Sequence, residues 1–324
     1  MSTSPLIQPQ SDSDLEALRQ EHYNASIIQL DFIHEMLMRV RVQADDGRLT
    51  YSPGQYTILA LGGWERRMDG PSRIAEEALS RRLIKRAYSI SCPLLDAQGT
   101  LAPCDSYPYL EFYITLVPRS DEEIPKRPPL TPRLFALREG DRLHMSHHIV
   151  GHYTLDPVQP EDDVIFVATG TGEAPHNAMA AELLGRNHQG RIASLTCVRE
   201  RSDAGYLKEQ HILSETYSNY QYHVYTTREP ENLDPAHPGY VGKQYIQDVF
   251  GSHQFEADFG WRPDPQRTHV FLCGNPDMIG VPQRLADGTH EFPEKKGMIE
   301  LLVGQGFQLQ HAHTPGNIHF EKYW

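Results

Sequence analysis

The sequence predicts a two-domain protein, in which an antiparallel β-barrel is followed by an α/β doubly wound parallel sheet. Up to about residue 158 the strand-like segments are short and separated by Pro or Gly, which is typical of antiparallel barrels. Beyond the Pro-rich, acidic stretch at 156–163, continuous apolar strands alternate with helical segments, which is typical of a parallel sheet. The expected division is an N-terminal tail, a barrel domain and an α/β domain, over residues 1–26, 27–158 and 159–324.

The first domain is expected to contain several short strands and one helix. The helix is predicted over 130–141, because Thr131 suits an N-cap, Pro132 the first helical position and Gly140 the C-terminal stop. Residues 27–42 have a mixed pattern, and residues 61–85 form an insertion with a helix-prone middle at 72–86. The clear strands are QYTILAL (55–61), RAYSIS (86–91), LEFYITLV (110–117) and DRLHMS (141–146).

The second domain is expected to alternate strands with helices. DVIFVATG (163–170) is a continuous apolar run that ends in Gly, as in a strand buried on both faces. The alternation that follows predicts helices on both faces of the sheet. Further strands are expected in RIASLTCV (191–198), YQYHVYTT (220–227) and THVFLCG (268–274), and helices in NAMAAELLG (177–185), YLKEQHILSETY (206–217) and KQYIQDVF (243–250).

The composition restricts the class of protein. The net charge of −13 over 324 residues argues against general nucleic-acid binding. No apolar run approaches the roughly 18 residues of a membrane span, and the first twenty residues do not resemble a secretory signal. The four cysteines are scattered without a CxxC pair, which indicates reduced thiols in the cytoplasm and no cluster held by closely spaced cysteines: Cys92, Cys104, Cys197 and Cys273.

The strand RAYSIS carries the first candidate site. On a strand, Arg86 and Tyr88 share one face, whereas Ser89 points to the other. A cation beside an aromatic ring suits a ligand with an anionic part and a flat part. The alternative is an ordinary strand with a solvated Arg and a half-buried Tyr.

Two strand ends of the second domain carry further candidates. FVATGTGEAP (166–175) is a glycine turn between a buried strand and a helix, where backbone N–H groups and the helix N-terminus favour a diphosphate. FLCGNPDMI (271–279) places Cys273 at a strand end, with Gly274 allowing close approach of the backbone. The alternative for Cys273 is a buried structural thiol beside a plain turn.

Basic residues follow several of these strands, and the chain ends in aromatic residues. Arg199, Arg228 and Lys243 could converge on a phosphate, although surface cations are usually just solvated. Tyr323 and Trp324 would expose a large apolar area if the tail were free. We therefore expect the tail to pack on something flat.

Six segments in a fixed order resemble the bacterial ferredoxin(flavodoxin)–NADP reductases, within the plant-type ferredoxin–NADP reductase superfamily. The resemblance extends from about residue 27 to Trp324. Separately the segments are moderately specific, but together they are highly so. They are RAYS, LTPRLFALREGD, VGHYTLD, ATGTGEAP, FLCGNP and EKYW.

This resemblance implies an FAD site. Arg86 would pair with the FAD diphosphate, Tyr88 would pack on the flavin ring and Ser89 would hydrogen-bond near flavin N5. Tyr323 would cover the other flavin face, with Trp324 near the adenine half. The remaining implied contacts are Ala87, Phe112, Tyr113, Ile114, Leu130, Thr131 and Thr169.

The resemblance also implies an NADP site and a catalytic set. Arg199, Arg228 and Lys243 fall where the family holds the 2′-phosphate. Lys243 replaces a more usual Arg, so that selectivity for NADP over NAD is expected to be weaker. The residues implied around the nicotinamide and diphosphate are Thr169, Thr171, Gly172, Cys273, Gly274 and Asn275, and the implied catalytic residues are Ser89, Cys273, Glu321 and Tyr323.

The function implied by the resemblance is electron exchange between NADPH and a one-electron carrier protein through FAD. The expected partners are ferredoxin and flavodoxin in transient electrostatic complexes, to which the basic cluster from Arg66 to Arg86 would contribute. A monomer is expected, with neither nucleic acid nor membrane as partner.

Three alternatives stay open. One is an NAD(P)H-dependent flavin reductase or oxygenase reductase of the same superfamily, which would not depend on a protein partner. Another is a flavin-holding module that has lost catalysis, although Ser89, Cys273 and Glu321 argue against it. The third is a metal protein, suggested by His144, His147, His148, His152, His311 and His313, but the lack of paired cysteines and nearby acids favours no metal.

Overall fold

The computed structural model describes residues 12–68, 82–104, 106–116, 130–285, 289–310 and 314–323. The chain divides into two compact units. Unit 1 comprises Met1–Tyr51, Tyr56–Ser89 and Tyr107–Val150, and unit 2 comprises Ser52–Gln55, Ile90–Ser106 and Gly151–Trp324. Within the described ranges no helix has both the length and the apolar character needed to cross a membrane.

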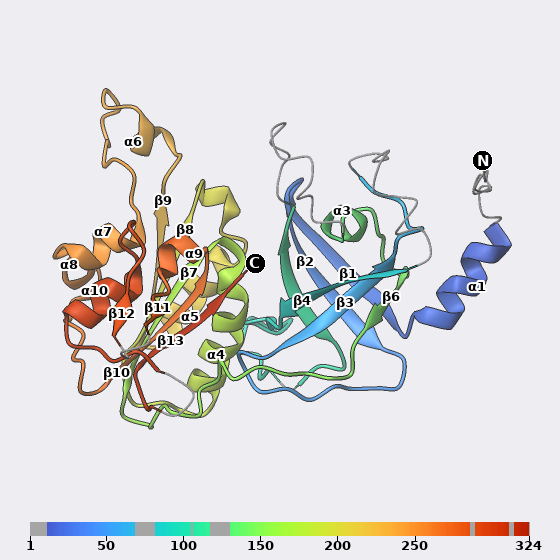
Figure 1. The fold of residues 1–324 in the computed structure, drawn as a ribbon, viewed down its shortest axis with the longest axis horizontal. Helices are drawn as coiled ribbons and strands as arrows, with labels where there is room; N and C mark the ends of the chain where they lie inside the picture. The colour runs from blue at the N-terminus through green and yellow to red at the C-terminus, as the bar shows by residue number, and fades with distance from the viewer. Residues whose placement is uncertain are drawn as a thin grey trace. The chain divides into compact units, whose positions relative to one another are not determined.

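Unit 1 is built on a six-stranded antiparallel sheet with the strand order β4-β3-β6-β1-β2-β5 (Figure 1). The two edge strands approach each other, because the rings of Tyr88 on β4 and Phe112 on β5 meet edge to face with centroids 6.5 Å apart. The sheet therefore curls on itself, and the predicted antiparallel barrel is confirmed. The strands are β1 (Ala25–His34), β2 (Leu37–Ala44), β3 (Tyr56–Gly62), β4 (Leu83–Ser89), β5 (Leu110–Thr115) and β6 (Arg142–Met145).

Two predictions for unit 1 need correction. The mixed segment 27–42 lies within two long strands, β1 and β2, whose antiparallel pairing contains two register shifts that blur its period-two pattern. The predicted helix over 130–141 is one turn only, α3 (Thr131–Leu134). Leu130, not Thr131, is the residue at its N-cap, and it has helical dihedrals and makes no side-chain cap. The Gly140 N–H donates to the Ile27 carbonyl, which ties the following chain to β1 instead of continuing a helix.

The helix-prone middle of the insertion was placed at 72–86. Residues 69–81 lie outside the described residues. The end of the segment, from Leu83 to Arg86, belongs to strand β4 and pairs with β3, so that part of the helix prediction is wrong. Residues 83–86 form a strand because their pairing with β3 outweighs their local preference for a helix.

Helix α1 (Asp12–His22) lies where the sequence predicted part of a mobile tail. Its anchor is the Glu65 carboxylate, whose side chain is only 9% exposed. Arg19 donates to both carboxylate oxygens, at 2.9 and 2.8 Å, and the Tyr23 hydroxyl donates to Oε1 at 2.9 Å. The Trp64 indole N–H adds a fourth donor at 3.2 Å. Four donors on one shielded carboxylate hold the helix on the barrel.

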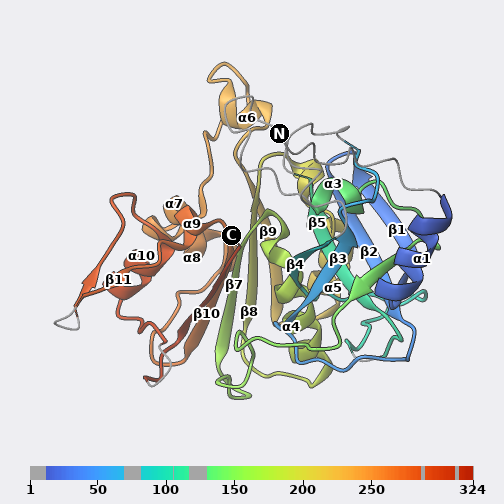
Figure 2. The ribbon, with the colours of Figure 1, turned by 45° about the vertical axis from the view of Figure 1, so that its right-hand side comes forward.

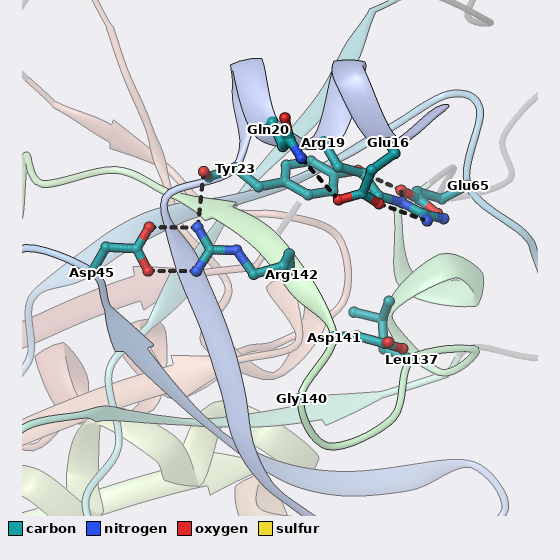
Figure 3. A pocket seen from close by; sticks show the side chains of 10 residues that line it. All are labelled: Glu16, Arg19, Gln20, Tyr23, Asp45, Glu65, Leu137, Gly140, Asp141 and Arg142. Atoms are coloured by element: carbon teal, nitrogen blue, oxygen red, sulfur yellow. Dashed lines mark hydrogen bonds and ion pairs between the residues drawn. The ribbon is translucent and has the colours of Figure 1, made fainter. Parts of the chain in front are cut away.

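A polar pocket of about 510 Å³ lies beside this anchor (Figure 3). The Arg142 guanidinium pairs with the Asp45 carboxylate at one side and donates to the Tyr23 carbonyl at 3.1 Å. The Arg19–Glu65 pair lies at the other side. Both cations that line the pocket are therefore already paired with protein acids.

Unit 2 contains a five-stranded parallel sheet with the order β13-β10-β7-β8-β9. The predicted parallel sheet is confirmed, including its long apolar strands, which are buried along most of their length. The strands are β7 (Asp163–Thr169), β8 (Ile192–Val198), β9 (Tyr220–Thr226), β10 (Thr268–Gly274) and β13 (Ile318–Lys322).

Helices cover both faces of this sheet (Figure 2). Alternate residues of each strand point to opposite faces. Ile165 and Val167 of β7 belong to a large apolar cluster with α7, α8 and α10, whereas Phe166 stacks on His176 of α4 on the other face. The helices are α4 (Glu173–Gly185), α5 (Leu207–Thr216), α6 (Pro230–Leu233), α7 (Ile246–Gly251), α8 (Gln254–Phe259), α9 (Pro276–Ile279) and α10 (Met298–Gly304), with a small hairpin of β11 (Gln283–Arg284) and β12 (His290–Glu291).

The Glu65 anchor is tested by replacing it. We expect Glu65→Ala to lower the free energy of unfolding by about 2 kcal/mol, because Arg19 and Tyr23 lose a shielded charged acceptor. Chemical denaturation measures the loss, and limited proteolysis should show faster cleavage within α1. Glu16→Ala is the control, since Glu16 is exposed and lies 4.0 Å from Arg19, and should change stability by less than about 0.5 kcal/mol. Equal losses in the two variants would contradict the anchor.

Candidate functional site

The strand order of unit 2 identifies one edge of the sheet as a ligand site. The chain passes from β7 to β8 and β9 on one side, and then returns to the other side of β7 with β10. The direction of winding therefore reverses between β7 and β10. Open parallel sheets bind ligands beyond the carboxyl ends of the strands at such a point. The two glycine-containing segments singled out in the sequence follow these two strands.

The glycine turn after β7 packs directly against the end of β10. The turn is a short 3₁₀ helix, Gly170–Gly172. A Cβ atom on Gly172 would lie 2.3 Å from the Cys273 carbonyl oxygen, and one on Gly274 would lie 2.3 Å from Thr169 Oγ1. The Asn275 N–H donates to Thr169 Oγ1 at 2.7 Å. Residues predicted for the dinucleotide site are thus brought together by contacts that only glycine permits.

The C-terminal strand adds Glu321 and Tyr323 to this edge. In the register of β10 with β13, Cys273 pairs with Glu321. The Tyr323 N–H donates to the Gly274 carbonyl at 3.1 Å, and its hydroxyl donates to the Thr171 carbonyl at 3.2 Å. Burial and the nearby Glu321 carboxylate raise the pKa of the Cys273 thiol well above its usual value, so that the thiol stays protonated near neutral pH. Trp324 lies outside the described residues.

The three predicted phosphate-binding cations lie near one another. The Arg228 N–H donates to the Arg199 carbonyl at 2.8 Å, and the Gln244 N–H, next to Lys243, donates to the Thr226 carbonyl at 3.1 Å. All three cationic side chains are exposed. Within the described ranges, none of them is paired with a carboxylate. The structure therefore brings Arg199, Arg228 and Lys243 to the same end of the sheet, where they are available to an anion.

The predicted flavin residues of unit 1 cluster on β4, β5 and the start of α3. Tyr88 packs on Phe112 and is hydrogen-bonded to the Thr131 hydroxyl; burial is the main effect that raises the pKa of Tyr88, to about 12. Thr131 thus meets Tyr88 instead of capping a helix. Ser89 and the remaining residues predicted on β5 and before α3 are buried in unit 1: Phe112, Tyr113, Ile114 and Leu130.

Arg86 and Ala87 are exposed on the same strand. Elsewhere in the described residues no carboxylate forms an ion pair with Arg86. The burial of this strand departs from strict alternation, because Lys85, Arg86 and Ala87 are all exposed, whereas Tyr88 is half-buried and Ser89 is buried. Unit 1 therefore offers an available cation near an aromatic ring, the two features predicted for binding an anionic, flat ligand.

These surroundings fit the two predicted nucleotide cofactors. In unit 2, the turn Gly170–Gly172 leads directly into the N-terminus of α4, and no described atom lies within 4 Å of a Cβ built on Gly170, so the turn has open space for a diphosphate beside the helix start. In unit 1, Arg86, which forms no ion pair with a described residue, lies near Tyr88 and suits a diphosphate joined to a ring. Tyr88 belongs to unit 1 and Tyr323 to unit 2. Their predicted clamp on the two faces of a flavin stays a prediction.

Two of the histidines that suggested a metal have protein partners. His144 Nδ1 lies 3.2 Å from the His22 carbonyl oxygen, and His147 Nε2 lies 3.3 Å from the Asp46 carboxylate. In the ranges given above, no three His, Cys, Asp or Glu residues are grouped as metal ligands. His311 and His313 lie outside those ranges.

Sequence reasoning missed Glu173, the first residue of α4. Its side chain is buried, with the residue only 1% exposed, and Oε1 accepts from the Tyr222 hydroxyl at 2.8 Å and from Gln210 at 3.4 Å. Burial raises the pKa of Glu173 from 4.5 to about 7, and the Tyr222 and Gln210 hydrogen bonds partly oppose that rise. The sequence offered one signal, an acidic residue directly after the glycine turn. Its burial could not be read from the sequence, because acids in the first turn of a helix are usually exposed.

Known proteins share this arrangement. Residues 166–283 match the Oxidoreductase NAD-binding domain family. A flavodoxin/ferredoxin–NADP reductase from Escherichia coli K12 is 27% identical over 235 residues, which cover 71% of this chain and 77% of that protein. A ferredoxin NADP+ reductase from Neisseria gonorrhoeae, solved with bound FAD and NADP, has a TM-score of 0.66 at 16% identity, covering 92% of this chain and 97% of that one.

A second solved structure widens the comparison. The FAD/NAD-binding domain of a nitric oxide dioxygenase from Vibrio cholerae has a TM-score of 0.59 at 14% identity, over 93% of this chain and 98% of that one. Residues 166–283 of unit 2 are thus similar to oxidoreductase NAD-binding domains, and the two solved structures share the fold of this chain. The resemblance to the bacterial ferredoxin(flavodoxin)–NADP reductases is confirmed by these relatives.

An alanine substitution at Gly172 tests the contact between the glycine turn and β10. We expect Gly172→Ala to lower the free energy of unfolding by about 3 kcal/mol, because its Cβ would overlap the Cys273 backbone. Thermal and denaturant unfolding measure the loss. Gly251→Ala is the matched control, since nothing lies within 4 Å of a Cβ at Gly251, and it should be neutral or slightly stabilising. A Gly172→Ala variant as stable as the wild type would show that the turn is not tightly packed.

The buried Glu173 predicts a specific dependence of stability on pH. Between pH 4.5 and about 7 the folded protein holds a proton that the unfolded chain has released, so stability falls as pH rises through this window. We expect the fall to amount to about 3 kcal/mol and to be absent from Glu173→Gln. The measurement is the free energy of unfolding of both proteins at several pH values from 4.5 to 8. If their difference did not change with pH, Glu173 would not have a raised pKa.

Proposed function

We propose that this protein transfers electrons between NADPH and a one-electron carrier protein, ferredoxin or flavodoxin, by means of bound FAD. The observation that carries the proposal is the convergence of the glycine turn, the end of β10 and the C-terminal strand at the switch point of the parallel sheet. The relatives named for this activity, which share most of the chain's length, support it.

FAD is assigned to the exposed side of β4 in unit 1. Arg86 would neutralise the diphosphate, and Tyr88, held by Thr131 and Phe112, would support the flavin ring. The hydrogen bond and the edge-to-face contact fix the Tyr88 ring before the cofactor arrives, which reduces the entropy lost on binding. Ser89 is assigned the hydrogen bond near flavin N5.

NADPH is assigned to the switch point of unit 2. The turn Gly170–Gly172 and the start of α4 would hold the diphosphate, and Arg199, Arg228 and Lys243 would hold the 2′-phosphate. Cys273 is fully buried and protonated, so that it can shape the nicotinamide pocket without adding charge. Glu321 lies beside Cys273 across the strand pair and would orient the nicotinamide.

FAD would supply the ability to accept a hydride and to release its electrons singly. The chain's own residues would align the two cofactors and control access. Tyr323 is held through its backbone N–H and its hydroxyl at the same sheet edge, so it would have to move for the nicotinamide to bind, a step that could limit turnover. Exposed Arg66, Arg82, Lys85 and Arg86 would attract an acidic carrier protein.

The test is anaerobic reduction of the FAD-loaded protein. Addition of NADPH should bleach the flavin absorbance within the dead time of manual mixing, and added ferredoxin or flavodoxin should then be reduced. Protein that does not bind FAD, or bound FAD that NADPH leaves oxidised, would refute the proposal. Faster electron transfer to free flavin than to either carrier protein would instead indicate a flavin reductase.

The phosphate-binding cations predict the selectivity between the two nicotinamide cofactors. We expect Arg228→Ala to reduce kcat/KM for NADPH roughly 10- to 100-fold with little change for NADH, because only NADPH carries the 2′-phosphate. Lys243→Arg should increase the preference for NADPH. Arg186→Ala serves as the control, because Arg186 is exposed after the far end of α4. An equal loss with NADPH and NADH in Arg228→Ala would contradict the assignment.

A further inference from the structure

A buried hydrogen-bond network lies behind the glycine turn, on the face of the sheet covered by α4 and α5. It starts at Glu173, which accepts from Tyr222 of β9 and from Gln210 of α5. Gln210 also donates to Asn177 of α4 at 2.8 Å and accepts from the Tyr220 hydroxyl at 2.5 Å. All of these residues are less than 7% exposed. The network therefore connects the first turn of α4 to α5 and β9 within a dry interior.

The network extends toward the segment that follows β4 in the sequence. Asn177 donates to Ser91 Oγ at 3.4 Å, and Ser91 Oγ lies 3.1 Å from the Tyr206 hydroxyl. Ser91 comes two residues after Ser89. The network thus contains Glu173, which is adjacent to the proposed diphosphate site. It also contains Ser91, which is close in sequence to Ser89, a predicted flavin contact.

One atom of this network is incompletely satisfied. Glu173 Oε2 is buried and accepts no hydrogen bond of ordinary geometry from the described residues, although the Thr196 hydroxyl lies close to it. An ionised carboxylate in such a place is costly, whereas a protonated one is tolerated. Glu173 directly follows Gly172, the residue whose backbone meets the end of β10. Any charge on Glu173 therefore lies within one side-chain length of the first turn of α4, which is proposed to hold the diphosphate.

We propose that Glu173 is a positioning residue that couples binding of the dinucleotide diphosphate to uptake of protons by its own carboxylate. The proposal rests on the function proposed above. With Glu173 protonated, the N-terminus of α4 presents its positive end to the diphosphate. With Glu173 ionised, a shielded negative charge adjoins the same backbone N–H groups and opposes the anion.

Of the other groups that face Glu173, the two tyrosines, His176 and Thr196 do not titrate near neutrality. From β9 come Tyr222 and Tyr220, whose pKa values burial raises far above neutrality. From α5 come Glu209 and, against the Tyr222 ring, His211. Within α4, burial lowers the pKa of His176 to about 3, so that it is neutral over the working range. Thr196 of β8 does not titrate.

Thermodynamic linkage determines whether the affinity for NADP+ rises or falls with pH. A bound diphosphate raises the pKa of Glu173 above its value of about 7 in the free protein, so binding takes up a proton just above neutrality. By reciprocity, the affinity for NADP+ falls as pH rises through this range and then levels off. A rise of one pKa unit corresponds to a loss of about tenfold in affinity and an uptake of about half a proton at pH 7.5.

The experiment is calorimetric titration of the FAD-loaded protein with NADP+, in pairs of buffers that differ in ionisation enthalpy, from pH 6 to 9. We expect about half a proton more to be taken up by the wild type than by Glu173→Gln at pH 7.5. We also expect the affinity of the wild type relative to that of Glu173→Gln to fall about tenfold across the range. The 2′-phosphate of NADP+ titrates too, with a pKa of about 6, but it contributes equally to both proteins and cancels in the difference.

Two further variants separate this role from a merely structural one. Tyr222→Phe removes a hydrogen bond that favours the ionised form, so the midpoint of the affinity change should move to higher pH by roughly half to one unit. Glu215→Gln removes an exposed acid in the last turn of α5, which is not among the groups that act on Glu173, and should keep the wild-type midpoint and proton uptake. A structural defect would weaken binding equally at every pH.

The outcomes are distinguishable. Tight NADP+ binding with equal proton uptake by the wild type and Glu173→Gln overturns the coupling and leaves the proposed function in place. An equal dependence of NADP+ affinity on pH in the wild type and Glu173→Gln also overturns the coupling and leaves the proposed function in place. A wild-type protein that binds FAD but no NADP+ at any pH overturns the proposed function and the coupling together.

Discussion

The rest of the site depends on the close approach of the glycine turn to the end of β10. At Gly172 the two backbones are too near for any side chain, because a Cβ would lie 2.3 Å from the Cys273 carbonyl oxygen. This contact lies where α4 begins and where β10 ends, at Cys273 and Gly274. Through the pairing of β10 with β13, it also fixes Glu321 and Tyr323. One steric constraint thus positions side chains from segments about 150 residues apart in the chain.

The two faces of the parallel sheet differ in the chemistry of the residues buried on them. The face covered by α7, α8 and α10 is an apolar cluster that stabilises unit 2. The face covered by α4 and α5 carries a polar network around Glu173, which is less favourable to bury and depends on nearly every group being paired. A protein that needed only stability would gain from apolar residues there. In the coupling proposed above, the polar interior places Glu173 immediately after the glycine turn, where its protonation would affect an anionic ligand.

Much of the fold could be predicted from the sequence, because buried parallel strands such as 163–169 have continuous apolar runs and glycine turns follow them. The turn, Cys273 and Asn275 could be placed at one sheet edge for the same reason. The short α3 and the docked α1 could not be predicted, since tertiary contacts decide both: Gly140 bonds to β1, and Arg19 finds the shielded Glu65. The buried state of Glu173 depends on partners in α5 and β9 that no local pattern connects.

Amide hydrogen exchange with and without NADP+ tests the central claim most directly, because it reports where the dinucleotide contacts the backbone. The FAD-loaded protein should show slower exchange at 169–173 and 273–275 when NADP+ is added, while β1 and β2 of unit 1 exchange as before. Saturating NADP+ that slowed exchange elsewhere and left both segments unchanged would contradict the claim that the contact between the glycine turn and β10 forms the dinucleotide site.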